Sequence, residues 1–235
     1  MNSSLFDLYS LVVLLVLAII LPLVGIWDFQ RLLNMIAAGQ VDARTKAYKW
    51  TLIIQWGLVL GLGGWWILAG RGLAPLGLLP LASGWQWLAI GLGMVASILT
   101  IWQMVDIIGN SEKLKKARIE MGELGELAPQ SAEEHRLFNA VAVTAGVCEE
   151  ILYRGLLLAT LAPLTGTWQA VALSSAIFGL GHAYQGVIGI GKTAVIGLIM
   201  ALLTVFSGSL FVAMLLHIVI DLTSGRIMAA AREDV

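Results

Sequence analysis

The chain has 235 residues, of which 59% are hydrophobic and only 12% are charged, and its formal net charge at pH 7 is −1. A soluble domain usually carries about 25% charged residues, so this composition excludes an ordinary soluble protein. It predicts an all-α, polytopic transmembrane helix bundle embedded in a lipid bilayer. A net charge this close to zero argues against a nucleic-acid partner. The single cysteine, Cys148, excludes a disulfide within the chain.

Gaps between charged residues predict about seven membrane spans, because about 20 apolar residues suffice to cross a bilayer. The first apolar run lacks the basic region of a secretory signal peptide, so we expect it to be retained as a span. The stretch Gly72–Gly84 is apolar as well, but Pro75, Pro80 and its glycines predict a loop or an interfacial segment. The expected spans are Leu8–Trp27, Trp50–Gly70, Trp85–Val105, Leu137 to just before Pro163, Trp168–Ala183, Thr193–Ser207 and Leu210–Ile227.

The spans group into N-terminal transmembrane helices (1–110), a polar cytoplasmic connector (111–136) and a C-terminal membrane core (137–230). Only this core carries ionisable residues in the middle of its spans. With seven spans, all of the 14 Lys and Arg residues except Arg71 and Arg154 fall on one side. Because Lys and Arg collect on the cytoplasmic side, we expect a multi-pass inner (plasma) membrane protein with its N-terminus outside and its C-terminus in the cytoplasm.

Two adjacent glutamates, Glu149 and Glu150, lie inside the fourth expected span. An ionisable group in a bilayer costs at least about 2.5 kcal/mol, so such residues are functional candidates. Glu150 precedes Arg154 by four residues, the favourable order for an ion pair within a helix. Glu149 is rotated from Glu150 by about 100° around the helix. We therefore expect Glu150 to brace Arg154, whereas the partners of Glu149 must come from other helices.

Two histidines complete a set of polar side chains inside apolar segments. His182 lies at the end of the fifth expected span, and His217 lies in mid-span with Asp221 one turn later on the same face. A carboxylate so placed can orient an imidazole and fix its tautomer. Two mechanisms are compatible with the set. Glu149, His182 and His217 can hold a catalytic Zn²⁺. In the metal-free alternative, Glu149 and one histidine activate water while the other histidine and Asp221 stabilise an oxyanion.

Three motifs occur in order along this region, and each lies in an apolar span. They resemble the motifs of the CPBP family, the CAAX prenyl protease and bacteriocin-processing intramembrane endopeptidases, also called the abortive-infection family. The resemblance covers roughly Phe138–Gly225. The motifs are Glu-Glu-Ile-Leu-Tyr-Arg-Gly (149–155), Phe-Gly-Leu-Gly-His (178–182) and His-Ile-Val-Ile-Asp (217–221).

The resemblance implies an α-helical intramembrane metalloprotease that cleaves a membrane-associated protein or peptide. It implies that Glu149 and His182 activate water and that His217 and Asp221 complete the site and stabilise the oxyanion. Glu150, Arg154 and Phe178 are implied as supporting residues. The last motif position is often Asn in this family. Because an amide donates to an oxyanion and an ionised carboxylate does not, Asp221 leaves that role open.

Two other functions are alternatives to an endopeptidase. A small transporter or proton-coupled carrier would use the ionisable groups as a relay, but transporters commonly have duplicated halves, and this chain has no internal repeat. A non-catalytic immunity or scaffold protein on the same fold is the other alternative. Gly186–Thr193 matches the Walker A pattern, but it joins two spans without an α/β domain, so we do not expect nucleotide binding. The glycines there predict a tight turn and close helix packing.

Overall fold

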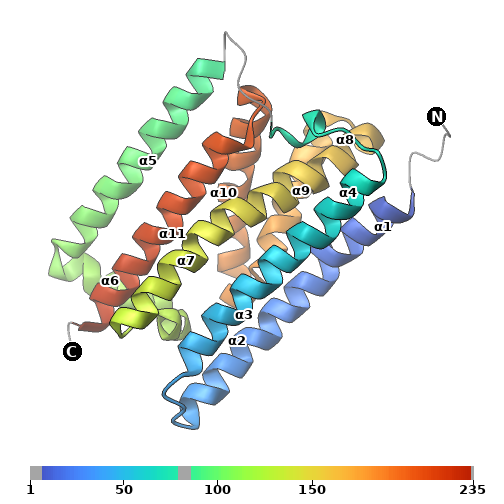
Figure 1. The fold of residues 1–235 in the computed structure, drawn as a ribbon. Coiled ribbons are helices and arrows are strands. Elements are labelled where there is room, and N and C mark those ends of the chain that lie inside the picture. The colour runs from blue at the N-terminus through green and yellow to red at the C-terminus, as the bar shows by residue number, and fades with distance from the viewer. Residues whose placement is uncertain (1–6, 79–85, 234–235) are drawn as a thin grey trace.

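The computed structural model describes residues 7–78 and 86–233, and within these ranges the chain is an all-α bundle of eight continuous helices with no sheet (Figure 1). The predicted all-α class is confirmed. Three of the helices contain a π-helical segment: α1–η1–α2 (Leu8–Leu15, Val16–Ile20, Leu21–Ala37), α3–η2–α4 (Ala43–Leu58, Val59–Gly63, Gly64–Leu68) and α7–η5–α8 (Ala132–Glu149, Glu150–Leu157, Leu158–Thr165). The others are α5 (Gln86–Ile108), α6 (Ser111–Met121), α9 (Thr167–Gly181), α10 (Gly186–Ser207) and α11 (Leu210–Glu233).

Five helices are long and apolar enough to cross a membrane, so the protein is a multi-pass membrane protein, as predicted. These candidate spans are Leu8–Ala37, Ala43–Leu68, Gln86–Ile108, Ala183–Ser207 and Leu210–Arg232. The helices at the fourth and fifth expected spans are not among these five candidates. The α7–α8 helix carries Glu149, Glu150 and Arg154 within its apolar part, and α9 has 15 residues, fewer than the roughly 20 that a span needs.

The first helix does not end at Trp27, as the sequence predicts, but continues through Asp28 to Ala37. A charged residue near a membrane surface does not interrupt helical hydrogen bonding, so a gap between charges underestimates helix length. The described part of the predicted loop, residues 72–78, holds the short 3₁₀ turn η3 (Ala74–Leu76). Trp85, where the third span was expected to begin, and residues 79–84 lie outside the described residues.

The expected turn at Gly186–Gly191 is also wrong, because these residues form the first turns of α10. The reversal lies earlier, at η6 (Ala183–Gln185), and Gly186 takes a φ of +76° that favours glycine. No strand precedes this segment in the part of the chain that the structure describes. The strand and loop of a phosphate-binding motif are therefore not formed before Gly186–Thr193.

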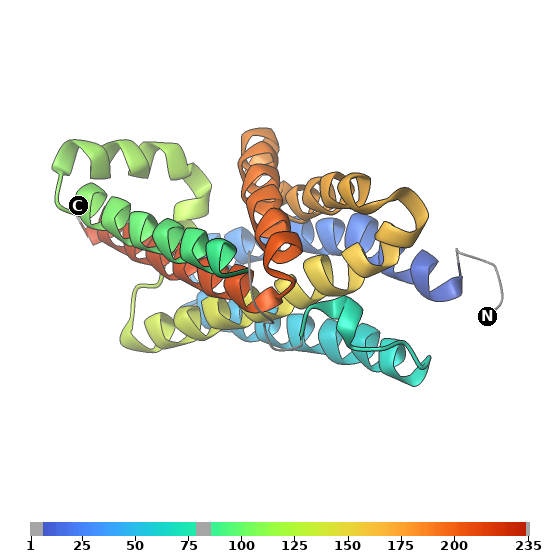
Figure 2. The same ribbon diagram turned by 90° about the horizontal axis from the view of Figure 1, so that it is seen from above.

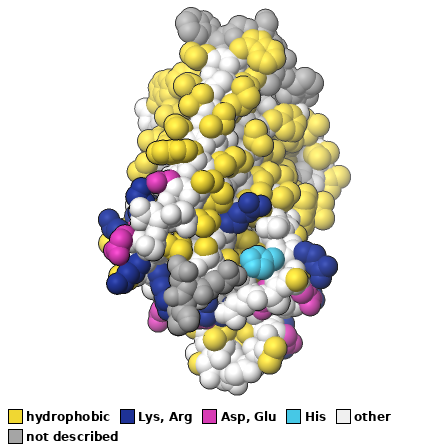
Figure 3. Space-filling model, turned by 90° about the vertical axis from the view of Figure 1, so that its left-hand side faces the viewer, with side chains coloured by type: hydrophobic (Ala, Val, Ile, Leu, Met, Phe, Trp, Pro, Cys, Tyr) yellow, Lys and Arg dark blue, Asp and Glu magenta, His cyan; other side chains and the backbone are white. Residues whose placement is uncertain are grey.

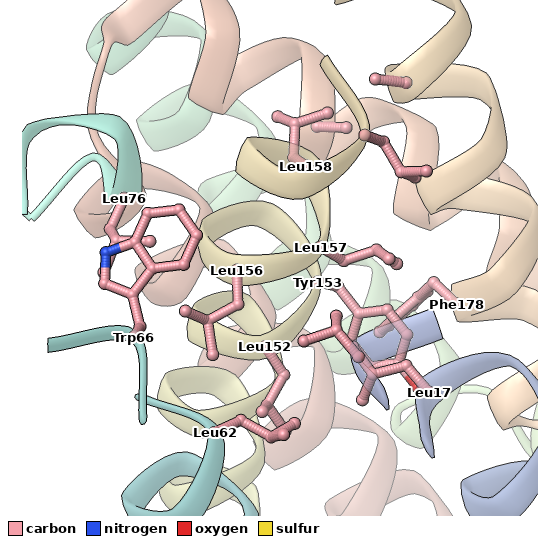
Figure 4. Close-up of a cluster of buried hydrophobic side chains, with 14 of the residues drawn as sticks. Leu17, Leu62, Trp66, Leu76, Leu152, Tyr153, Leu156, Leu157, Leu158 and Phe178 are labelled. Atoms are coloured by element: carbon pink, nitrogen blue, oxygen red, sulfur yellow. The ribbon is translucent and has the colours of Figure 1, made fainter. Parts of the chain in front are cut away.

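The main hydrophobic core joins the N-terminal helices to the helix that carries the two glutamates (Figure 4). Leu152, Leu156 and Leu157 of η5 are almost fully buried. They pack in one cluster with Leu17 of η1 and Leu62 of η2, each in the π-helical segment of its own helix. π-Helical segments are rare and often occur at functional sites, and here η5 starts at Glu150.

The other half of the bundle packs around α11. It lies beside α5 on one side and α7 on the other, and α7 in turn lies beside α3 (Figure 2). Gly146 of α7 permits the close approach of α11, since a Cβ atom there would lie 2.9 Å from the backbone nitrogen of Ile218. This contact sets the distance between the motif helix α7–η5 and the motif helix α11.

Charged side chains gather at one end of the bundle, and hydrophobic side chains cover most of the rest of the face in Figure 3. At that end, η4 (Gly122–Leu127) is tied to α3 and α11. The Glu126 carboxylate lies 2.6 Å from Arg44 and 3.0 Å from Arg232, and the Tyr48 hydroxyl donates to the Leu127 carbonyl oxygen at 2.6 Å. At the opposite end, Arg71 pairs with Asp7.

Candidate active site

Glu150 and Arg154 form the ion pair that their spacing predicts. Arg154 Nη1 donates to Glu150 Oε1 at 2.9 Å, and both side chains are fully buried. Arg154 Nη2 donates to the carbonyl oxygen of Gly197 in α10 at 3.0 Å. Two buried charges are tolerated because they neutralise each other, although Glu150 Oε2 and Arg154 Nε have no hydrogen-bond partner among the described residues. The pair thereby links η5 to α10.

Glu150 also holds His217, and this contact was not predicted from the sequence. His217 Nδ1 lies 2.8 Å from the same Glu150 Oε1 atom. A carboxylate that already accepts from Arg154 is an acceptor, so Nδ1 is the protonated nitrogen of the imidazole. The interpretation that Asp221 fixes the tautomer is therefore wrong: Asp221 Oδ2 lies 3.6 Å from the other nitrogen, Nε2, beyond hydrogen-bond distance.

His182 is held in the same way by its own helix. Its Nδ1 lies 2.9 Å from the carbonyl oxygen of Phe178, which can only accept, so Nδ1 is again protonated and Nε2 carries a free lone pair. The Phe178 ring packs against both histidines, with centroids 4.8 Å from His182 and 5.9 Å from His217. Its face also carries the Arg154 guanidinium at 4.1 Å. Phe178 thus fixes the spacing of these groups.

Glu149 faces both imidazoles. Its Oε2 atom lies 4.0 Å from His182 Nε2 and 3.9 Å from His217 Nε2. That oxygen is buried and has no hydrogen-bond partner among the described residues. Three acceptor atoms thus converge without a donor between them. A buried polar atom needs a partner, so this place suits a water molecule, a proton or a cation.

The fold brings Glu149, His182, His217 and Asp221 together from α7, the end of α9, and α11. The signal that identified them is their burial as ionisable groups within apolar segments. The side chain of Asp221 is the most exposed of the four, at 32%.

A zinc ion is compatible with the types of atom that converge here. Zn²⁺ binds carboxylate oxygen and imidazole nitrogen at about 2.0–2.2 Å, which puts neighbouring ligands of a tetrahedral site about 3.4 Å apart. The separations of 3.9 and 4.0 Å from Glu149 Oε2 are wider, and no group of three such side chains in residues 7–78 and 86–233 is close enough to hold a metal as it stands. The unpaired Oε2 atom and the two free Nε2 lone pairs nevertheless supply the right ligands.

A cavity of about 190 Å³ opens in front of this cluster, and Glu149 and His182 lie on its wall. The opposite wall comes from the N-terminal helices. Most of its side chains are apolar, including Leu21, Val24, Phe29 and Leu32 of α2 and Ile54 and Leu58 of α3. His217 and Asp221 are not among the residues that line the cavity.

Sequence reasoning missed several polar residues of this wall, among them Asp28 of α2 and Gln55 of α3. The Gln55 side-chain nitrogen donates to Glu149 Oε1 at 2.8 Å. A signal for Gln55 was present, because an uncharged polar residue in mid-span also needs a partner. Asp28 follows directly after the expected first span, Leu8–Trp27, and so carries no such signal.

Residues 134–223 match the sequence profile of the family described as Type II CAAX prenyl endopeptidase Rce1-like. The chain contains an Rce1-like type II CAAX prenyl endopeptidase domain. This confirms the resemblance stated from the three motifs, and it makes the domain a member of a peptidase family. No curated protein sequence and no solved structure matched the chain. The Rce1-like segment contains Glu149, His182, His217 and Asp221, whereas Asp28 and Gln55 lie outside it.

Proposed function

We propose that this protein is an intramembrane endopeptidase that hydrolyses a peptide bond of a membrane-associated protein or peptide. One observation carries the proposal. Glu149 Oε2 is buried without a hydrogen-bond partner at the wall of a cavity, and two imidazole nitrogens face it at 3.9 and 4.0 Å. A carboxylate in this position can take a proton from water held between it and a histidine.

The proposed reaction proceeds in two steps. A water molecule bound between Glu149 Oε2 and His182 Nε2 loses a proton to Glu149 as its oxygen attacks the scissile carbonyl carbon. On this metal-free route His217 carries a second proton, on Nε2, and this N–H donates to the oxyanion while Glu150 holds the Nδ1–H. Glu149 then returns the proton to the leaving nitrogen as the C–N bond breaks, giving a carboxylic acid and an amine.

The same atoms are the proposed ligands of a metal. Glu149, His182 and His217 would hold a Zn²⁺ ion, which lowers the pKa of a bound water and polarises a carbonyl. In either case Glu150 and Arg154 keep the His217 ring in place, and Phe178 packs against both histidines. Removal of a group that orients a ligating or catalytic histidine typically costs 10- to 100-fold in affinity or activity.

We further propose seven spans, with α7–α8 and α9 crossing the membrane beside the five clear candidates. This count puts the two ends of the chain on opposite sides, and the ends of the described chain do lie at opposite ends of the bundle (Figure 1). The charged end of Figure 3 would face the cytoplasm, with the N-terminus outside the inner (plasma) membrane. The proposed division is N-terminal helices 1–110, connector 111–136 and catalytic core 137–230.

The substrate is proposed to enter from the cytoplasmic side or laterally from the bilayer. Prenylated C-terminal peptides, bacteriocin leaders and membrane-bound regulators all belong to this class. The family description makes a prenylated CAAX-type peptide the first probe.

The test uses the purified full chain in lipid nanodiscs and an internally quenched, farnesylated CAAX-type peptide. Cleavage at one bond, with one ¹⁸O from labelled water in the new carboxyl group, is the expected result. Bacteriocin-leader and single-span peptides form the second panel. If no peptide in either panel is cleaved, while reconstituted liposomes show proton-coupled uptake that depends on Glu149, the protein is a carrier and the proposal is wrong.

A further inference from the structure

Gln55 lies on α3, in the half of the chain that the Rce1-like segment does not include. Its side chain nevertheless reaches the glutamate of the first motif. The nitrogen of the Gln55 amide donates to Glu149 Oε1 at 2.8 Å. Because an ionised carboxylate can only accept, this contact decides which end of the amide is nitrogen and which is oxygen.

The other end of the same amide has no partner. Gln55 Oε1 is buried and accepts no hydrogen bond from the described residues, although Gln55 lines the cavity. Two polar side chains earlier on the same helix, α3, are already engaged. The Thr51 hydroxyl donates to the Ala47 carbonyl oxygen, and the Tyr48 hydroxyl donates to that of Leu127. Gln55 Oε1 is therefore a free acceptor directly beside the carboxylate of Glu149.

A peptide that enters this cavity brings the matching groups. Its backbone N–H groups lose water among apolar side chains and need acceptors. An amide oxygen on the wall meets that need without selecting a particular side chain. We infer that Gln55 is a bridging residue of the site: its nitrogen positions Glu149, and its oxygen binds one backbone N–H of the substrate next to the scissile bond. This inference rests on the proposed peptidase function.

The geometry also restricts which N–H is bound. Gln55 and the reacting carboxylate are in direct hydrogen-bond contact, and an extended chain advances about 3.3–3.6 Å per residue. The bound N–H must then belong to a residue within about two positions of the scissile bond.

The test is an ester scan combined with a substitution. In a set of otherwise identical farnesylated peptides, each backbone N–H near the scissile bond is replaced in turn by an ester oxygen, which removes one donor. Wild type should lose about tenfold in kcat/KM at one position within two residues of the scissile bond, the usual effect of one hydrogen bond. Gln55→Met keeps the length of the side chain without its polar atoms, and it should lose less than about twofold at that position.

With the peptide that contains only amide bonds, Gln55→Met should change both KM and kcat. We expect KM to rise about tenfold because the substrate contact is lost, and kcat to fall about tenfold because Glu149 is no longer held. Gln86→Met is the matched control. Gln86 Oε1 is also buried without a partner among the described residues, but it lies at the start of α5, away from the cavity. Its ester profile should match that of wild type.

Binding of a non-hydrolysable farnesylated peptide separates this inference from the proposed function. Its Kd should rise about tenfold in Gln55→Met and in the matching ester peptide, whether or not wild type cleaves anything. Equal ester profiles in wild type and Gln55→Met would overturn the inference. The inference would also be overturned if no ester position lowered kcat/KM in wild type. This result needs only the wild-type protein, so it holds even if Gln55→Met does not fold. Failure of wild type to bind the peptide would also overturn it, whereas binding without cleavage would contradict only the peptidase proposal.

Discussion

Replacement of Arg154 by Met tests the buried charge network that holds His217. Arg154 is 1% exposed, donates to Glu150 at 2.9 Å and to the Gly197 carbonyl oxygen at 3.0 Å, and lies over Phe178. Met has a similar length but no charge. The substitution leaves Glu150 buried with only His217 as a donor.

Removing one partner of a buried ion pair usually costs about 3–5 kcal/mol, because the other charge stays desolvated. We therefore expect Arg154→Met to lower the free energy of unfolding by about 3–5 kcal/mol. The assay is a reversible SDS titration of the purified protein in mild-detergent micelles, followed by far-UV circular dichroism. The double variant Glu150→Gln/Arg154→Met removes both charges and should recover at least about 2 kcal/mol of that loss.

The matched control is Lys46→Met, which removes an ion pair with the same spacing and order. Lys46 lies 3.0 Å from Asp42 four residues earlier, but both side chains are more than half exposed. An exposed pair of this kind contributes about 0.3–0.5 kcal/mol, so the control should differ little from wild type. A loss below about 1 kcal/mol for Arg154→Met, or a double variant no more stable than the single one, would refute the account of the pair as a desolvated brace.

Three further outcomes follow from the geometry. Gly146→Ala should destabilise the protein by about 1–3 kcal/mol in the same titration, because the new Cβ would meet the Ile218 backbone. The control Gly57→Ala should not destabilise it, because nothing lies within 4 Å of a Cβ at that position. Equal stabilities of the two variants would contradict the close contact between α7 and α11. Asp221→Asn should keep kcat/KM within about tenfold of wild type, since it preserves the shape and polarity beside His217 and one lost hydrogen bond is worth about tenfold or less; a loss above about 1000-fold would mean that the charge itself is required. The purified chain should hold about one Zn²⁺ by elemental analysis, and a chelator should remove activity that Zn²⁺ restores; full activity in metal-free protein would establish the metal-free route.

The candidate site was predictable because its ionisable residues lie in segments that are otherwise apolar. Glu149, His182 and His217 are ionisable groups within apolar segments, where a polar side chain needs a partner. This reasoning predicts that they meet, and the structure brings them together. It also predicts the Glu150–Arg154 pair, since both residues share one helix face at a fixed spacing.

The remaining contacts depend on packing between helices, which helical periodicity does not specify. The bond from Glu150 to His217 depends on how closely α11 approaches α7, and the contact of Gln55 with Glu149 depends on the rotation of α3. The end of the first helix was misplaced for a simpler reason: charge marks the edge of the membrane, whereas the helix continues beyond it to Ala37.

The most direct test of the central claim is cleavage by Glu149→Gln. This variant keeps the size of the side chain and removes its ability to take a proton from water. The farnesylated peptide should be cleaved at least about 1000-fold more slowly, within the range expected for loss of a general base, while the unfolding transition stays close to that of wild type. Glu133→Gln, at an exposed glutamate on the same helix, should cleave at the wild-type rate. If Glu149→Gln retains wild-type activity, Glu149 is not the residue that activates water, and the proposed mechanism is wrong.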